Sequence, residues 1–321
     1  MSDTYLGYLL SGWALLLFTA SILLTKAASA RLDLGLGFLI ATSTNVVFSA
    51  LAFGVHMQLR TDYLQWNLSA FLMFAAAGGF STYLGRWFFY ESVVRFGPAK
   101  ASIFQISSPL FTATIAWLLL GERLTPLVVL GMVMTIAGLI LVSSKPGVFS
   151  RRGATAAMAP DGEPAPAVAN SSTMQRLMQS VLLLGLGSSL AYAIGNVLRG
   201  SAVRSWNEPV LGALIGAACG LALQVAFSAG KGAMVSRLRA ASRGGMALFV
   251  TIGVTTIAAQ MCAIAAMRYI PLSVATLVTL CTPILVFPLS HLLFKNQDKV
   301  TALTLAGSGL TLLGIAIIVM R

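Results

Sequence analysis

The sequence predicts an all-α, polytopic membrane protein with ten transmembrane helices, arranged as two inverted five-helix repeats. Of its 321 residues, 57% are hydrophobic and only 9% are charged, whereas soluble domains carry about 25% charged residues. Apolar runs long enough to cross a bilayer follow one another with short polar gaps, as in helical membrane proteins. A third observation, a sequence pattern that occurs once in each half of the chain, predicts the repeats.

The apolar runs also predict the domain organisation. Residues 143–180 are rich in Ala, Pro, Gly and Ser and show no hydrophobic period, which is typical of a flexible linker. We therefore expect a first repeat over 1–142, the linker over 143–180 and a second repeat over 181–321. The expected helices are Tyr5–Ala28, Leu34–Met57, Trp66–Phe89, Pro98–Leu120, Pro126–Val142, Val181–Val203, Pro209–Ala229, Gly245–Met267, Pro271–Phe294 and Thr301–Met320.

Two matching segments indicate the repeat. RFGPAKASIFQISSP begins at Arg95, and RYIPLSVATLVTLCTP begins 173 residues later at Arg268. Each has a second proline inside an apolar run, and these prolines, Pro109 and Pro283, are 174 residues apart. Because each repeat has an odd number of helices, the second repeat enters the membrane from the opposite side. Inverted repeats of this kind are common in secondary transporters.

The two repeats also resemble a known family. The first contains FGPAKASIFQISSPLFTATIAWLLLGERLTPLVVLGMVMTIAGLILV, and the second contains RYIPLSVATLVTLCTPILVFPLSHLLFKNQDKVTALTLAGSGLTLLGIAIIV. Lys295 and Asn296 stand in the second where Gly121 and Glu122 stand in the first. Both stretches resemble the EamA-type domain of the drug/metabolite transporter superfamily. The resemblance implies a ten-helix exporter that moves amino acids, other metabolites or drugs through a central cavity between the halves.

Several other classes of protein are not expected. His56 and His291 have no companion cysteines, and the sequence has no C-x-x-C, H-E-x-x-H, G-x-S-x-G or Walker-type motif. We therefore expect no metal, no cofactor and no enzyme activity. The net charge of +12 lies in the gaps between apolar runs, which favours contact with lipid headgroups over nucleic acid. A non-transporting membrane scaffold and an intramembrane enzyme are the alternatives from other classes.

The predicted substrate site is built on the two prolines inside the helices. Proline has no N–H, so the carbonyls of Gln105 and Thr279, four residues before Pro109 and Pro283, lose their helical partners. An unpaired carbonyl is costly in lipid, so we expect both to face a central cavity. The alternative is a packing kink, with nearby hydroxyls bonded to their own helix. The predicted substrate-binding residues are Gln105, Ser108, Thr279, Thr282, Tyr83 and Asn196.

Other polar groups in the apolar runs have two interpretations. Asn45, Tyr192 and Gln260 either hold neighbouring helices together or contact the substrate. Lys26 and Arg199 either attract an anionic substrate or extend towards the lipid headgroups, and their positions near helix ends favour the second. No Asp or Glu falls in the middle of an expected helix, so we expect no proton coupling through a single central carboxylate.

Taken together, these features predict a secondary transporter in a bacterial inner membrane, as a monomer or a homodimer. It would move a small organic metabolite, an amino acid or a related compound, in the direction of export by alternating access of a central cavity. An uncoupled facilitator or exchanger is the alternative within transport. Ten spans place both termini on one side. The distribution of Lys and Arg favours a cytoplasmic linker, whereas the family resemblance favours cytoplasmic termini.

Overall fold

The computed structural model consists of helices and short connections, and it has no strand among the residues that it describes. Those residues are 3–29, 31–60, 63–89, 108–120, 125–143, 181–227 and 241–282, with isolated positions elsewhere. The helices are α1 (Asp3–Ser29), α2 (Leu34–Leu59), α3 (Leu68–Ala77), the π-helix η1 (Gly78–Gly85), α6 (Ser108–Leu120), α7 (Pro126–Ser143), α9 (Val181–Ser205), α10 (Pro209–Ala226), α12 (Arg243–Tyr269) and α13 (Leu272–Leu280).

Most of the expected helices correspond to a helix in the structure, with α3 and η1 together forming the third. The fourth and ninth are described only in part, since α6 begins at Ser108 and α13 ends at Leu280. Only isolated positions of the tenth, expected over Thr301–Met320, are described. The predicted linker lies outside the described residues from 144 to 180, so the domain boundaries stay predictions.

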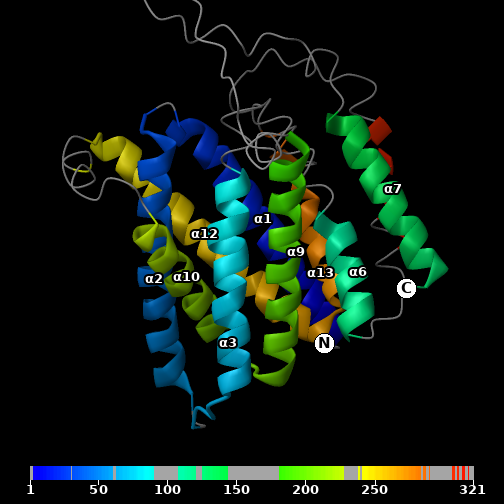
Figure 1. The fold of residues 1–321 in the computed structure, drawn as a ribbon, viewed down its shortest axis with the longest axis horizontal. Coiled ribbons are helices and arrows are strands. Elements are labelled where there is room, and N and C mark those ends of the chain that lie inside the picture. The colour runs from blue at the N-terminus through cyan, green and yellow to red at the C-terminus, as the bar shows by residue number, and fades with distance from the viewer. Residues whose placement is uncertain are drawn as a thin grey trace, which may run out of the picture.

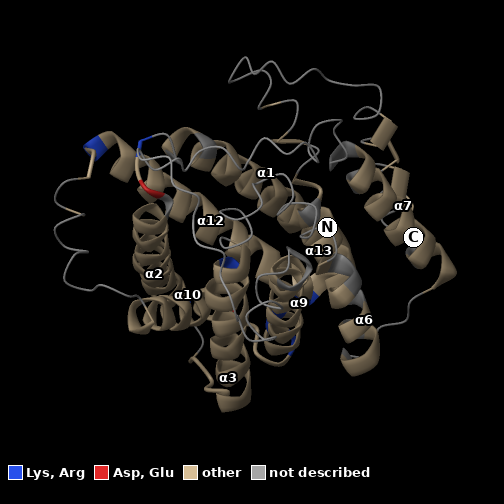
Figure 2. Cartoon of the chain, turned by 45° about the horizontal axis from the view of Figure 1, so that its top comes forward, with Lys and Arg blue, Asp and Glu red and all other residues tan. Residues whose placement is uncertain are grey.

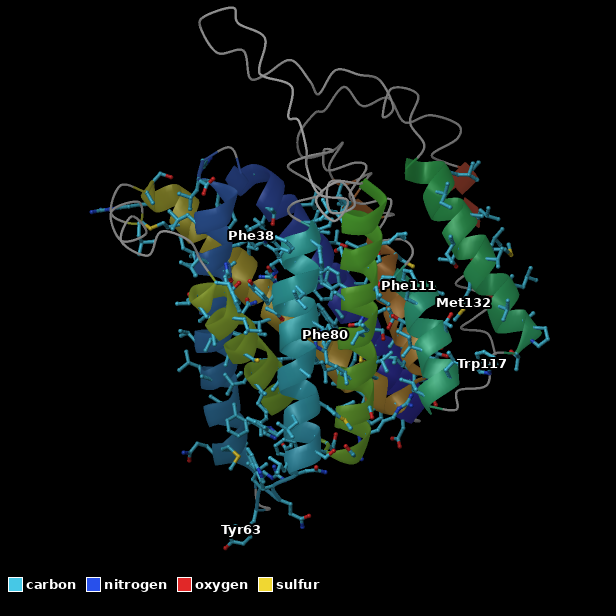
Figure 3. The ribbon with its side chains drawn as sticks, viewed as in Figure 1. Phe38, Tyr63, Phe80, Phe111, Trp117 and Met132 are labelled. Carbon is cyan, nitrogen blue, oxygen red and sulfur yellow. The ribbon has the colours of Figure 1, made fainter. Side chains whose placement is uncertain are left out.

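The surface of the bundle is suited to lipid. Within the part of the chain that the structure describes, five spans are long and apolar enough to cross a membrane, and they are formed by α1, α2, α3 with η1, α10 and α12. Large apolar side chains such as Trp13, Leu51 and Trp117 are exposed, and Figure 2 shows the helices almost entirely in the colour of uncharged residues. Tyr63 projects beyond the helix ends from the connection between α2 and α3 (Figure 3), where aromatic residues commonly meet the membrane interface.

Helices of the first half pack directly against helices of the second half (Figure 1). In the described residues, α1 packs along α12, α2 lies against α10 and α12, and α3 with η1 lies against α9 and α10. The helix α6 contacts α9 and α13, while α7 lies at the edge of the bundle (Figure 1). Any cavity among α2, η1, α9, α10 and α12 is therefore lined by both halves.

Close contact between α10 and the third span depends on glycine. The G-x-x-x-G steps at Gly212, Gly216 and Gly220 predict tight helix packing, and all three residues are buried. A Cβ atom on Gly78 would lie 2.2 Å from the carbonyl oxygen of Gly216. A Cβ atom on Gly212 would lie 2.4 Å from the ring of Phe74. A side chain larger than a hydrogen atom therefore does not fit at either position without a shift of the helices.

One end of the bundle is closed by aromatic rings and a buried carboxylate. The ring centroids of Trp66 and Trp206 are 5.5 Å apart. Glu208, which precedes α10, accepts a hydrogen bond from Arg60 at the end of α2. Its other oxygen lies 3.8 Å from His56 Nε2. These contacts join the first half to the second at this end.

We expect Glu208→Gln to lower the free energy of unfolding by about 1–3 kcal/mol, because it removes the charge that pairs with Arg60 inside the protein. The Glu208 side chain is only 5% exposed, whereas the Arg60 side chain is 21% exposed and reaches water more easily. Thermal unfolding of the purified protein in detergent measures the effect. Asp3→Asn, at an exposed helix start, is the control, and an equal shift in both variants would contradict the prediction.

Candidate functional site

A polar cavity lies between the two halves, and we call it the arginine cavity. Its volume is about 20 Å³, which is room for about one water molecule. This conformation is therefore closed, and a metabolite fits only if the surrounding helices move apart. The cavity is lined by Asn45, Thr82, Arg86, Arg199, Gly212, Ala213, Gly216, Ala217, Thr256, Ile257 and Gln260.

Arg199 is the most deeply placed charge in the cavity. It lies on α9 with only 5% of its surface exposed. Its Nη2 donates to Ser81 Oγ on η1, and its Nη1 lies 3.4 Å from Asn196 Oδ1. The preference for an arginine that extends towards the headgroups is therefore wrong for Arg199, because the side chain turns inward to the neighbouring helix.

Arg86 approaches the same cavity from the third span. Its Nη1 donates to Thr42 Oγ1 at 2.9 Å, and its guanidinium lies 5.5 Å from the centre of the Phe38 ring. Tyr192 on α9 lies near both guanidinium groups and interacts electrostatically with each of them.

The π-helix η1 positions this side of the site. A π-turn has one more residue than an α-turn, so it rotates the residues that follow it around the helix axis. Ser81 and Thr82 lie within η1, and Arg86 follows it directly. The sequence predicts a regular helix here, whereas the structure has a π-turn at Gly78–Gly85. The sequence feature that accompanies the π-turn is the pair of glycines at 78 and 85. Gly85 packs closely against α9, because a Cβ atom there would lie 3.2 Å from the Tyr192 ring.

The far wall of the cavity comes from α2 and α12. With its amide oriented to face the nearby carbonyls, the Asn45 nitrogen donates to Gly253 at 2.7 Å and to Ala41 at 2.9 Å. Asn45 therefore joins α2 to α12 and lines the cavity as well. Thr256 and Gln260, one helical turn apart on α12, also line it.

The cavity carries positive charge without a described counter-charge. Among the described residues, Glu208 is the only carboxylate in an ion pair with a cation that the structure also describes, and it pairs with Arg60 and His56. It is not among the residues that line the cavity, although it lies one helical turn before the lining residue Gly212. The three described carboxylates, Asp3, Asp33 and Glu208, all lie at helix starts. The arrangement attracts anions and disfavours cations.

The proline-based residues lie mainly on another pair of helices. Ser108 is buried at the start of α6, which packs against α13. Thr279 donates to the carbonyls of its own helix, and Thr282 donates to the Thr279 carbonyl. Among the described residues, none of these three lines the arginine cavity. Whether they face substrate stays a prediction.

The other predicted residues are dispersed. Tyr83 stacks on Phe227 with ring centroids 5.7 Å apart. Asn196 lies beside Arg199, but it is not among the residues that line the arginine cavity. Gln105 and Pro283 lie outside the described residues. Pro109 belongs to α6.

Two further hydroxyls lie on the proline-bearing helices. Thr112 on α6 and Thr276 on α13 are buried, and their hydroxyl oxygens have no hydrogen-bond partner among the described residues. Buried polar atoms are normally satisfied by protein or water. Both hydroxyls therefore lie unsatisfied on helices that contact each other.

If Thr282 lines a path for substrate, a bulky side chain there blocks transport while the protein still folds. We expect Thr282→Trp to lower the transport rate by about tenfold or more, with little loss of expression. Initial rates in proteoliposomes, together with the yield of monodisperse protein, provide the measurement. Loss of folded protein in parallel with transport would instead give Thr282 a packing role.

The fold and the cavity define an integral, multi-pass membrane protein with a polar site between two repeats. The chain belongs to the EamA-like transporter family, whose model matches residues 5–144 and 179–320. The family and the two-repeat, all-α architecture expected from the sequence are thereby confirmed. A solved crystal structure with 17% identity is similar in fold, with a TM-score of 0.69 and coverage of 98% of this chain and 96% of that one. No curated protein matches the sequence.

Proposed function

We propose that the protein is a secondary transporter that exports a small organic metabolite, an amino acid or a related compound, by alternating access of the arginine cavity. The observation that carries the proposal is the placement of this cavity, whose lining comes from α2 and η1 of the first repeat and from α9, α10 and α12 of the second. Family membership supports membrane transport. A bacterial inner membrane is the proposed location.

The closed cavity supports an alternating mechanism. Both ends of α2 hold contacts to the second repeat: Arg60 bonds to Glu208, and the backbone carbonyl of Arg31, just before α2, accepts a hydrogen bond from Ser242 at 3.2 Å. If one set of contacts opens while the other stays closed, the cavity faces one side of the membrane at a time. This is the arrangement that inverted-repeat transporters use.

Transport by the purified protein tests the proposal. Proteoliposomes loaded with a mixture of amino acids, organic acids and nucleosides should release at least one of them faster than empty liposomes do. Thr256→Trp, which fills the cavity, should abolish that release. No flux of any compound from correctly folded protein would favour the scaffold alternative. Equal rates with and without a pH gradient would favour an uncoupled facilitator or exchanger.

A further inference from the structure

We propose that the arginine cavity recognises a small metabolite through an oxyanion, a carboxylate or phosphate group, which binds between Arg86 and Arg199. This inference rests on the proposed function, because it names the class of substrate for the same cavity.

The burial of uncompensated charge is the first argument. A cationic side chain inside a membrane protein is costly unless it is paired or faces water. The described partners of the two arginines are all uncharged: Ser81 and Asn196 for Arg199, and Thr42, Tyr192 and the Phe38 ring for Arg86. Both guanidinium groups also line the same small cavity, so two like charges face one space. An anion between them removes both costs.

The shape of the guanidinium group is the second argument. Each arginine has five N–H donors in a planar fork, which matches the two oxygens of a carboxylate or the oxygens of a phosphate. The described hydrogen bonds use only part of these donors on Arg86 and Arg199. The rest of the substrate would meet Thr82, Thr256 and Gln260, which are polar and uncharged.

The alternative is that the two arginines only hold helices together. Arg199 joins α9 to η1 and Arg86 joins the third span to α2, so each has such contacts. This role explains the bonds to Ser81 and Thr42. It does not explain why both cations line one cavity that has no described carboxylate. An anion site requires this combination of two cations and no carboxylate.

Ligand binding to the purified protein in detergent tests the proposal. The probes are succinate, inorganic phosphate and succinamide, the neutral diamide that matches succinate in size. Succinate or phosphate should raise the unfolding temperature in a saturable manner, and succinamide should not. A response to succinate alone identifies a carboxylate site, and a response to phosphate alone identifies a phosphate site. Equal responses to succinate and succinamide, or no response to either anion, would overturn the proposal.

Two variants locate the binding. Arg199→Gln and the less buried Arg86→Gln should each weaken anion binding by about tenfold to a hundredfold. Arg243→Gln, which makes the same change at an exposed position in the first turn of α12, should leave it unchanged. Should Arg199→Gln fail to fold, Arg86→Gln carries the test. Unchanged affinity in the Arg86 variant, or equal weakening in the Arg243 control, would overturn the proposal.

The failure of this inference is distinguishable from the failure of the proposed function. Transport of a neutral compound, with no effect of succinate or phosphate on binding, would leave the transporter intact and remove the oxyanion site. Anion binding without flux of any compound would leave the oxyanion site intact and contradict the proposed transport function.

Discussion

We expect Arg86→Gln and Arg199→Gln each to lower the rate of transport by about tenfold to a hundredfold. The double variant should transport only slightly more slowly than the slower of the two single variants. If both guanidinium groups hold one oxyanion, they act as a unit, and removal of either costs most of the binding that the pair provides. Initial rates in proteoliposomes, normalised to the amount of folded protein inserted, are measured for the parent protein, the two single variants and the double variant. Together they form a double-mutant cycle.

The exposed Arg268 at the end of α12 offers a matched control, and Arg268→Gln should transport at the parent rate. If instead the effects of the two cavity variants multiply, the arginines act independently. That result would contradict the proposal that one oxyanion binds to both Arg86 and Arg199.

Gly78→Ala is expected to have the largest effect on folding. Its Cβ would lie 2.2 Å from the carbonyl oxygen of Gly216 and 2.7 Å from its Cα. Both obstacles are backbone atoms, which cannot rotate away as a side chain can. Either α10 must shift or the π-turn of η1 must be lost, and overpacking of this kind costs about 1–3 kcal/mol or more. Because both elements line the arginine cavity, transport should fall as well.

The yield of monodisperse protein and its unfolding temperature measure this effect. Gly54→Ala is the control, since a Cβ at that position on α2 has no neighbour within 4 Å. It should be neutral or slightly stabilising, because alanine favours the helix. Equal behaviour of the two variants would contradict the tight contact between η1 and α10.

The sequence predicted most of the fold for a physical reason. In lipid, each span must be a continuous apolar helix, so composition alone places the helices, and prolines at 126 and 209 mark two of their starts. The repeated Arg–aromatic–x–Pro pattern indicated the two halves. The interleaving of the halves, with α1 along α12, depends on tertiary packing and has no local signal.

The site was predictable only in part. Asn45 and Gln260 are polar residues in apolar runs, and that signal was real because both line the cavity. Arg86 and Arg199 lie near helix ends, where an arginine can reach either the headgroups or the interior. Which way it turns depends on the rotation of the helix, and the π-turn before Arg86 changes that rotation. The residues around Pro109 and Pro283 stay a prediction.

The central claim is that the arginine cavity opens alternately to the two sides of the membrane. A cysteine at position 256, in a background without Cys219, Cys262 and Cys281, tests it most directly, because Thr256 lines the cavity. In sealed vesicles, a membrane-impermeant maleimide should label Thr256→Cys when added to either side, and the transported metabolite should slow the labelling from both. Labelling from one side only, or from neither side in folded and transport-active protein, would contradict alternating access of this cavity.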